Sequence, residues 1–271
     1  MVQNLLNIFM LSPKGFCAGV ERAVAVVEEA LVKFGPPIYV KHQIVHNRNI
    51  IEDLSSRGVI FTNNLNELPD GAVLIFNAHG VTKEFEEAVK NRNINYIDAT
   101  CPLVKKVHKE AIKHQDNNSQ ILIIGHKDHP EVIATKSRIS STSIVIEDVP
   151  GANNFIPKEN VQYAFVTQTT LSVDYINEII EILKQKIPTL ISSKNICYAT
   201  QNRQNAIKAV IDKIDGLIVV GSKNSSNSNR LKEIGEEYNI KSYLIDNNKD
   251  IPFEDLKEMK NIAISAGASS P

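Results

Sequence analysis

The segment DATCPLVKKVH, residues 98–108, places a cysteine directly before a proline and an amphipathic helical pattern. Proline is suited to the first turn of a helix, so we predict that Cys101 lies at a helix N-terminus. The same order of thiol and helical pattern occurs in two other segments, GFCAGVERA (15–23) and ICYATQNRQ (196–204). The sequence has only three cysteines, and they are widely and similarly spaced: Cys17, Cys101 and Cys197. The chain is therefore predicted to repeat one structural unit three times.

Short apolar runs follow the helical patterns, and polar stretches rich in His, Asn or Ser follow the runs. The clearest runs are residues 8–11, 38–41, 72–76, 120–125, 164–166, 217–221 and 262–265. Apolar runs of this kind, alternating with helices, are typical of parallel strands that are covered on both faces. We therefore predict an α/β fold of three small lobes with mainly parallel sheets in a pseudo-threefold arrangement. The predicted lobes are residues 1–98, 99–194 and 195–271.

The carboxyl ends of the predicted strands are where ligands bind in parallel α/β sheets. Each polar stretch follows an apolar run and therefore lies at such an end, so the three lobes are expected to face one central cleft. Further helices are predicted at about 48–57 and near 202–213, and Ile176, Ile179 and Leu183 lie on one face of another.

Composition excludes several classes of partner. The formal net charge is -1, with 42% hydrophobic and 23% charged residues, as in an ordinary globular protein. No basic field favours nucleic acid, and no apolar run approaches the ~20 residues that a membrane span needs. An odd number of cysteines without a signal-peptide pattern favours a reducing compartment over a disulfide framework. We expect neither nucleic acid nor membrane as a partner.

Three thiols in equivalent places favour a metal centre over three unrelated buried cysteines. Helix N-termini stabilise thiolates, and three thiolates favour zinc or an iron–sulfur cluster. A structural zinc site usually includes a close Cys-x-x-Cys pair, which this sequence lacks. We therefore prefer a four-iron, four-sulfur cluster in which one iron has no protein thiolate.

Histidines at predicted strand ends indicate an anion site. His46, His79 and His129 each follow an apolar run, and neutral or protonated imidazoles can donate hydrogen bonds to a polyanion. His108 and His114 fall in the helix predicted after Cys101, and we interpret them as solvated or capping residues.

The segment SKNSSNSNR (222–230) is the polar stretch of the last third. It follows a buried strand and precedes a helix that is predicted to begin at about Asn229. Its hydroxyls, amides and backbone N–H groups, Ser225 among them, would suit the same anion, and Ser269 repeats the pattern more weakly. Neither a GxxxxGK[ST] loop nor a GxGxxG turn is present, so nucleotide binding is not indicated.

Glu131 is the one carboxylate among these strand-end groups. With Pro130 before it, Glu131 could be no more than an acidic first-turn residue of a helix. Beside a reactive centre and the hydroxyl of Thr169, it would serve as a proton donor. We favour the second interpretation.

The motifs in their order along the chain resemble one known family. They are GFCAGVERA, VHNR, AHGV, DATCPLVKKVH, HPEV, TQTTLSVD, ICYATQNRQ, GSKNSSNSNRL and AGAS. Together they resemble the 4-hydroxy-3-methylbut-2-enyl diphosphate reductases, from about residue 8 to the C-terminus.

The resemblance implies a [4Fe-4S] cluster held by Cys17, Cys101 and Cys197 at the centre of a trefoil of α/β lobes. It implies catalytic roles for Glu131 and Thr169, which would manage the substrate hydroxyl and its protons. The implied substrate-binding residues are His46, His79, His129, Thr169, Ser225, Ser226, Asn227 and Ser269.

The reaction that the resemblance implies removes the substrate hydroxyl as water and gives isopentenyl and dimethylallyl diphosphates. This is the last step of the non-mevalonate isoprenoid pathway, and its electrons come from ferredoxin or flavodoxin. The implied location is the bacterial cytoplasm or a plastid-type stroma. The chain ends just past AGAS, so a further C-terminal helix of the family is expected to be missing.

Two other functions stay open at this point. An iron–sulfur hydro-lyase of the aconitase type also uses three cysteines and an open iron, but it needs no reductant. A non-catalytic iron–sulfur sensor would not require the anion pocket of histidines and serines.

Overall fold

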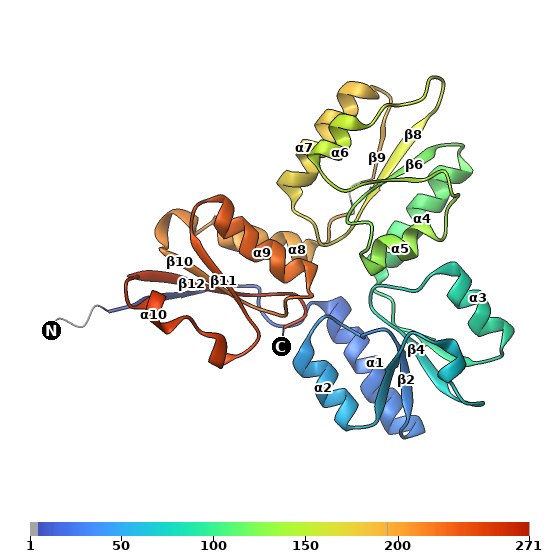
Figure 1. Ribbon diagram of the computed structural model, residues 1–271, viewed down its shortest axis with the longest axis horizontal. Coiled ribbons are helices and arrows are strands. Elements are labelled where there is room, and N and C mark those ends of the chain that lie inside the picture. Colours follow the sequence, from blue (N-terminus) through green and yellow to red (C-terminus); the bar gives the residue numbers. More distant parts are fainter. Residues whose placement is uncertain (1–4, 194, 271) are drawn as a thin grey trace.

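The computed structural model describes residues 5–193 and 195–270, which form three α/β lobes around a common centre (Figure 1). Each lobe contains one four-stranded parallel sheet. The strand orders are β3-β2-β4-β5, β7-β6-β8-β9 and β11-β10-β12-β1. The predicted α/β fold with parallel sheets is confirmed.

In the second lobe helices and strands alternate strictly, whereas in the first lobe two strands follow one another with only a 3-10 helix, Leu65–Glu67, between them. The first lobe contains α1 (Ala18–Phe34), β2 (Ile38–Lys41), α2 (Arg48–Ser56), β3 (Val59–Thr62), β4 (Val73–Phe76), α3 (Lys83–Asn91) and β5 (Asn95–Asp98). The second contains α4 (Pro102–Asp116), β6 (Gln120–Ile124), α5 (Pro130–Lys136), β7 (Ile144–Ile146), α6 (Val149–Asn154), β8 (Tyr163–Thr167), α7 (Val173–Lys186) and β9 (Ile191–Ser193).

The third lobe draws on both ends of the chain. It contains α8 (Tyr198–Lys208), β10 (Gly216–Val220), α9 (Ser226–Glu237), β11 (Lys241–Ile245), α10 (Phe253–Leu256) and β12 (Asn261–Ala266). Strand β1 (Asn7–Met10) pairs with β12, so this sheet includes a strand from the range 1–98 that the sequence analysis assigned to the first lobe. The lobe boundaries themselves stay a prediction.

The last strand of each sheet leads through a cysteine into the first helix of the next lobe. The three passages are β1–Cys17–α1, β5–Cys101–α4 and β9–Cys197–α8. Because all three passages lie at the carboxyl ends of parallel strands, the thiols gather at the centre of the molecule.

Each sheet is buried by the apolar faces of its helices. In the second lobe Ile176, Ile179 and Leu183 of α7 are fully buried, as their spacing predicts. Burying one such side chain contributes roughly 1.5–3 kcal/mol, so these faces fix the lobes individually. No helix in the described part of the chain has both the length and the hydrophobicity to cross a membrane.

Two predicted helix starts were wrong. Helix α8 covers 198–208, not 202–213, and α9 begins at Ser226 instead of about Asn229. In both helices the first turn is polar, so apolar spacing gives no signal there. The start of α9 is fixed by Ser225, whose hydroxyl accepts a hydrogen bond from the backbone N–H of Ser228.

Candidate functional site

The three cysteines occupy the same local position in the three lobes. Each is the N-cap residue of its helix, its side chain is half-buried, and none forms a disulfide. Burial raises the pKa of Cys101 and Cys197, whereas backbone N–H groups in the first turn of each helix lower it. The helix N-termini therefore compensate in part for the cost of burying thiolates.

One backbone hydrogen bond is repeated at all three cysteines. The N–H of Cys17 donates to Ala268, that of Cys101 to Ala78 and that of Cys197 to Thr169, each at 3.0 Å. Each acceptor carbonyl lies in the polar loop after β12, β4 or β8, at or next to a predicted ligand residue. The thiols and the polar loops are thus held together by the backbone.

Close packing brings two of the sulfurs to one point. A Cβ atom at Gly19 would lie 2.7 Å from the Sγ of Cys101 and 3.9 Å from that of Cys17. Only glycine leaves room there. Within the described residues, no three His, Cys, Asp or Glu side chains are close enough to share one metal ion. Thiolates suit zinc or an iron–sulfur cluster, and which group they would hold stays a prediction.

All twelve residues that the sequence analysis singled out line one cavity. The cavity is partly open to solvent and is lined by residues of all three lobes. Its lining includes Cys17, Cys101, Cys197, His46, His79, His129, Glu131, Thr169, Ser225, Ser226, Asn227 and Ser269.

Three imidazoles form one wall of the cavity. The rings of His46 and His79 stack with their centroids 4.3 Å apart. The ring of His129 lies edge-on to both, with its centroid 6.2 Å from that of His46 and 5.7 Å from that of His79. Burial lowers the pKa of His46 to about 4 and that of His129 to about 3, and it places the pKa of His79 well below its usual value. The wall is therefore uncharged near neutral pH.

The hydrogen bonds of these imidazoles are incomplete. Among the described residues, the buried Nδ1 atoms of His46 and His79 have no hydrogen-bond partner, which is costly unless a ligand engages the rings. The Nδ1 of His129 accepts from the backbone N–H of Glu131 at 3.2 Å, so in the neutral ring Nε2 carries the proton. His129 is thereby set up as a hydrogen-bond donor.

A buried carboxyl and a hydroxyl lie opposite one another at the second lobe. The Oε1 of Glu131 accepts from the backbone N–H of Thr169 at 3.0 Å, and Oε2 accepts from its Oγ1 at 2.9 Å. Burial raises the pKa of Glu131 to about 7, although both hydrogen bonds oppose the shift. Glu131 is also an acidic first-turn residue of α5, and its role as a proton donor stays a prediction.

Hydroxyl and amide groups form the wall at the third lobe. The Oδ1 of Asn227 accepts from the backbone N–H of Ala268 at 2.8 Å. The Oγ of Ser269 donates to the carbonyl of His46 at 3.0 Å. The same Oγ lies 3.4 Å from the Oγ of Ser225. The hydroxyl Oγ of Ser226 is 3.0 Å from the hydroxyl Oγ1 of Thr170 in the second lobe. These contacts join the third lobe to both others at the cavity rim.

The sequence analysis missed some residues that shape the cavity. Thr170 and Thr200 line it, and Asn47 donates from Nδ2 to the carbonyl of Ser269 at 2.8 Å. All three lie within motifs that were recognised, directly beside or near the residues that were named. His108 was wrongly interpreted as solvated or capping: it is buried, and its Nε2 has no partner.

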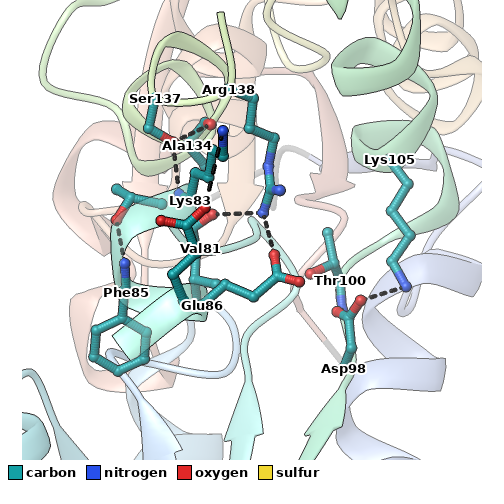
Figure 2. Close-up of polar contacts among 12 residues, drawn as sticks. Val81, Lys83, Phe85, Glu86, Asp98, Thr100, Lys105, Ala134, Ser137 and Arg138 are labelled. Atoms are coloured by element: carbon teal, nitrogen blue, oxygen red, sulfur yellow. Dashed lines mark hydrogen bonds and ion pairs between the residues drawn. The ribbon is translucent and has the colours of Figure 1, made fainter. Parts of the chain in front are cut away.

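The seam between the first two lobes is built around Arg138 (Figure 2). Its Nη2 donates to the Glu86 carboxylate and to the Val81 carbonyl, each at 3.0 Å, and the N–H of Lys83 donates to Ser137 Oγ at 2.9 Å. These contacts hold the end of α5 against the chain that follows His79. The seam thus fixes the helix that carries Glu131 relative to the imidazoles.

Comparison with known proteins relates the whole chain to one group. The family described as LytB protein matches residues 8–271. The chain is 46% identical to a 4-hydroxy-3-methylbut-2-enyl diphosphate reductase of Phenylobacterium zucineum, covering 98% of this chain and 86% of the relative. It is 45% identical to the protein of the same name from Magnetococcus marinus, with 98% and 88% covered.

Solved structures give the same relationship. The E-1-hydroxy-2-methyl-but-2-enyl-4-diphosphate reductase from Plasmodium falciparum matches with a TM-score of 0.96 at 40% identity, covering 98% of this chain and 85% of that one. A second structure, of (E)-4-hydroxy-3-methyl-but-2-enyl diphosphate reductase, the terminal enzyme of the non-mevalonate pathway, matches with a TM-score of 0.70 at 32% identity. It covers 98% of this chain and 95% of its own.

Proposed function

The chain belongs to the LytB protein family, and from this premise we propose that it converts (E)-4-hydroxy-3-methylbut-2-enyl diphosphate into isopentenyl diphosphate and dimethylallyl diphosphate. It is an enzyme, a reductase of the last step of the non-mevalonate isoprenoid pathway. The observation that carries the proposal is the meeting of three equivalent thiols, an uncharged imidazole wall and a buried carboxyl in one cavity.

Cys17, Cys101 and Cys197 would hold a [4Fe-4S] cluster with one iron free of protein thiolate. Three half-buried thiols at helix N-termini, none of them in a disulfide, fit such a group. When bound, the cluster would supply the electrons that reductive removal of a hydroxyl requires. A ferredoxin or flavodoxin would be the donor, as the resemblance implies.

The diphosphate would bind between the imidazole wall and the third lobe. His46, His79 and His129 offer hydrogen bonds without bringing a charge of their own, and two of them lack a partner for a buried nitrogen. The backbone N–H groups at the start of α9 add donors and the positive end of a helix dipole. The anion would thus be held by donors from all three lobes.

Glu131 and Thr169 would deliver the proton that lets the hydroxyl leave as water. The carbon–oxygen bond breaks, two electrons and two protons enter, and the products are one water and the deoxygenated diphosphate. A pKa of about 7 means that a large share of Glu131 is protonated at neutral pH, so it can donate. In the protonated form its hydrogen bond to Thr169 Oγ1 can reverse, which would pass the proton on through that hydroxyl.

Two alternatives can be separated from this function. A hydro-lyase of the aconitase type would act on its substrate without a reductant. A non-catalytic sensor would have no use for a buried acid and an anion pocket in the same cavity as the thiols.

An anaerobic assay tests the proposal. The protein is reconstituted with iron and sulfide, supplied with a reductant and hydroxymethylbutenyl diphosphate, and its products are separated. We expect both five-carbon diphosphates to form only when reductant is present. Turnover without reductant, or binding without any turnover, would contradict the proposed reaction. Cys101→Ser, carried through the same procedure, is the control for product that forms without the cluster.

A further inference from the structure

Arg203 is a buried arginine with no acidic side chain beside it. It lies in α8, two turns after Cys197, and only 2% of its surface is exposed. In the part of the chain that the structure describes, no carboxylate forms an ion pair with it, whereas Arg138, also largely buried, is paired with Glu86. The charge of Arg203 must therefore be balanced in another way.

The guanidinium donates only to backbone carbonyls. Nε donates to Ala266 at 3.1 Å, Nη1 to Ala199 at 3.0 Å and Nη2 to Gly15 at 2.5 Å. These carbonyls satisfy the hydrogen-bonding capacity on three sides, but a carbonyl carries no net charge. A buried cation without a counter-charge is strongly destabilising, so such an arrangement needs an anion nearby.

The carbonyls that Arg203 contacts show where that anion lies. Gly15 is two residues before Cys17, Ala199 is two residues after Cys197, and Ala266 ends the strand that leads to Ser269. Burial lowers the pKa of Arg203, and the charges of Cys17 and Cys197 act in the opposite direction.

We propose that Arg203 is a positioning residue that supplies the counter-charge for the thiolates of Cys17 and Cys197 and thereby raises the reduction potential of the cluster they hold. This inference rests on the proposed function. A cluster with three thiolates would be anionic and would gain one more negative charge on reduction, so a fixed cation bound to two of the cysteine loops would favour the reduced form. Arg203 does not line the cavity, and it therefore acts through the cysteine loops and not on the substrate.

A purely structural role would give a different result from an electrostatic one. Arg203→Gln and Arg203→Lys both lose the fork that joins Gly15, Ala199 and Ala266, so both should lower the thermal stability of the protein. Only the glutamine variant loses the charge. The matched control is Arg22→Gln, because exposed Arg22 also donates to backbone carbonyls near a cysteine, those of Thr100 and Asp98.

The experiment is an anaerobic redox titration of the reconstituted proteins, followed by the absorbance of the cluster and by EPR. At a fixed potential we expect the ratio of reduced to oxidised cluster to fall at least tenfold in Arg203→Gln, which is 59 mV for one electron. Arg203→Lys and Arg22→Gln should stay close to wild type. An unchanged potential in Arg203→Gln would overturn the inference.

If Arg203→Gln assembles no cluster, Arg203→Lys decides the question. If the cluster of Arg203→Lys has the wild-type reduction potential, the role of charge is supported. If its ratio of reduced to oxidised cluster at a fixed potential shifts tenfold from that of the wild type, the inference is overturned. Wild-type protein that assembles no cluster would overturn the proposed function itself, which is a separate and earlier outcome.

Discussion

In the cysteine loops the three lobes repeat one another, whereas in the polar loops beside them they differ. Every cysteine caps a helix and donates its backbone N–H to the neighbouring polar loop at the same distance. At or next to the accepting carbonyls, however, stand three different residues: His79, Thr169 and Ser269. The threefold repeat is kept in the backbone and the thiols and is lost in the side chains that face the cavity.

This difference matches the two kinds of ligand that the cavity would hold. A cubic cluster can accept three equivalent thiolates, so the loops that bind it can stay alike. The substrate has a diphosphate at one end and a hydroxyl at the other, and these need different groups. Lobe two alone supplies a buried carboxyl, and lobe three alone supplies hydroxyls and an amide without any imidazole.

The largest expected effect comes from breaking the repeated part. Replacing Cys17, Cys101 or Cys197 by Ser should abolish stable four-iron incorporation, because two thiolates cannot replace a three-point attachment. Iron and sulfide content and the visible spectrum after anaerobic reconstitution measure this, with His114→Ala as a control outside the cavity. If one of the three cysteines proved dispensable, the three loops would not be equivalent.

The next largest effect should come from the carboxyl that only lobe two has. Glu131→Gln should keep the cluster and bind substrate, but turnover should fall about 10²–10⁴-fold, as is typical when a positioned acid is lost. In the wild type, turnover should decline as pH rises through about 7, since Glu131 then loses the proton that it donates. If Glu131→Gln turned over substrate as fast as the wild type across the pH range, a group other than Glu131 would have to supply the proton.

The imidazole wall should make the protein sensitive to acid. His46 and His129 keep a lowered pKa when folded but regain about 6.5 when unfolded, so the unfolded chain binds more protons below pH 6.5. Each should cost about 1.4 kcal/mol of stability per pH unit between pH 6.5 and its folded pKa. Urea unfolding of the apoprotein followed by circular dichroism tests this, and His46→Gln should show a shallower dependence. An equal slope in both proteins would contradict it.

The two walls of the anion pocket should each contribute modestly. His46→Ala and Asn227→Ala should raise the substrate dissociation constant about tenfold or more, since a hydrogen bond to a charged group contributes roughly 1.5–3 kcal/mol. The cluster spectrum should be unchanged in both. Titration calorimetry under anaerobic conditions measures the dissociation constants. In the wild type, amide exchange in residues 222–230 should also become slower when the substrate binds. Normal binding by both variants would remove these residues from the site.

The smallest effect is expected at the seam of the first two lobes (Figure 2). Glu86→Gln removes a partly buried ion pair with Arg138 and a more exposed one with Lys90, and it should cost about 1 kcal/mol of unfolding free energy or less. Glu87→Gln, which removes an exposed pair with Lys83, is the matched control and should have no measurable effect. Equal losses in both variants would show that the seam is not special.

Much of the fold could be predicted because its central strands are apolar throughout. Strands β4, β6, β8 and β10 were found at nearly their observed bounds. Among the outer strands β1 was predicted, as the run 8–11. The others, β3, β5, β7, β9 and β11, were not, and most of these expose polar side chains. Such strands owe their existence to the sheet edge they pair with, which no local pattern records.

The sequence alone determined the thiols, their helices and the polar residues that would surround a ligand, because these are local features of the chain. Only the tertiary structure decided that β1 joins the third sheet by pairing Asn7 with Asn261, and that Arg203 is buried with its guanidinium on the carbonyls of Gly15 and Ala199. Parallel pairing across the whole chain leaves no mark in either segment, and an arginine in a polar helix looks solvated until its neighbours are known. Both depend on contacts between residues far apart in the sequence, whose free energies exist only once the lobes have come together.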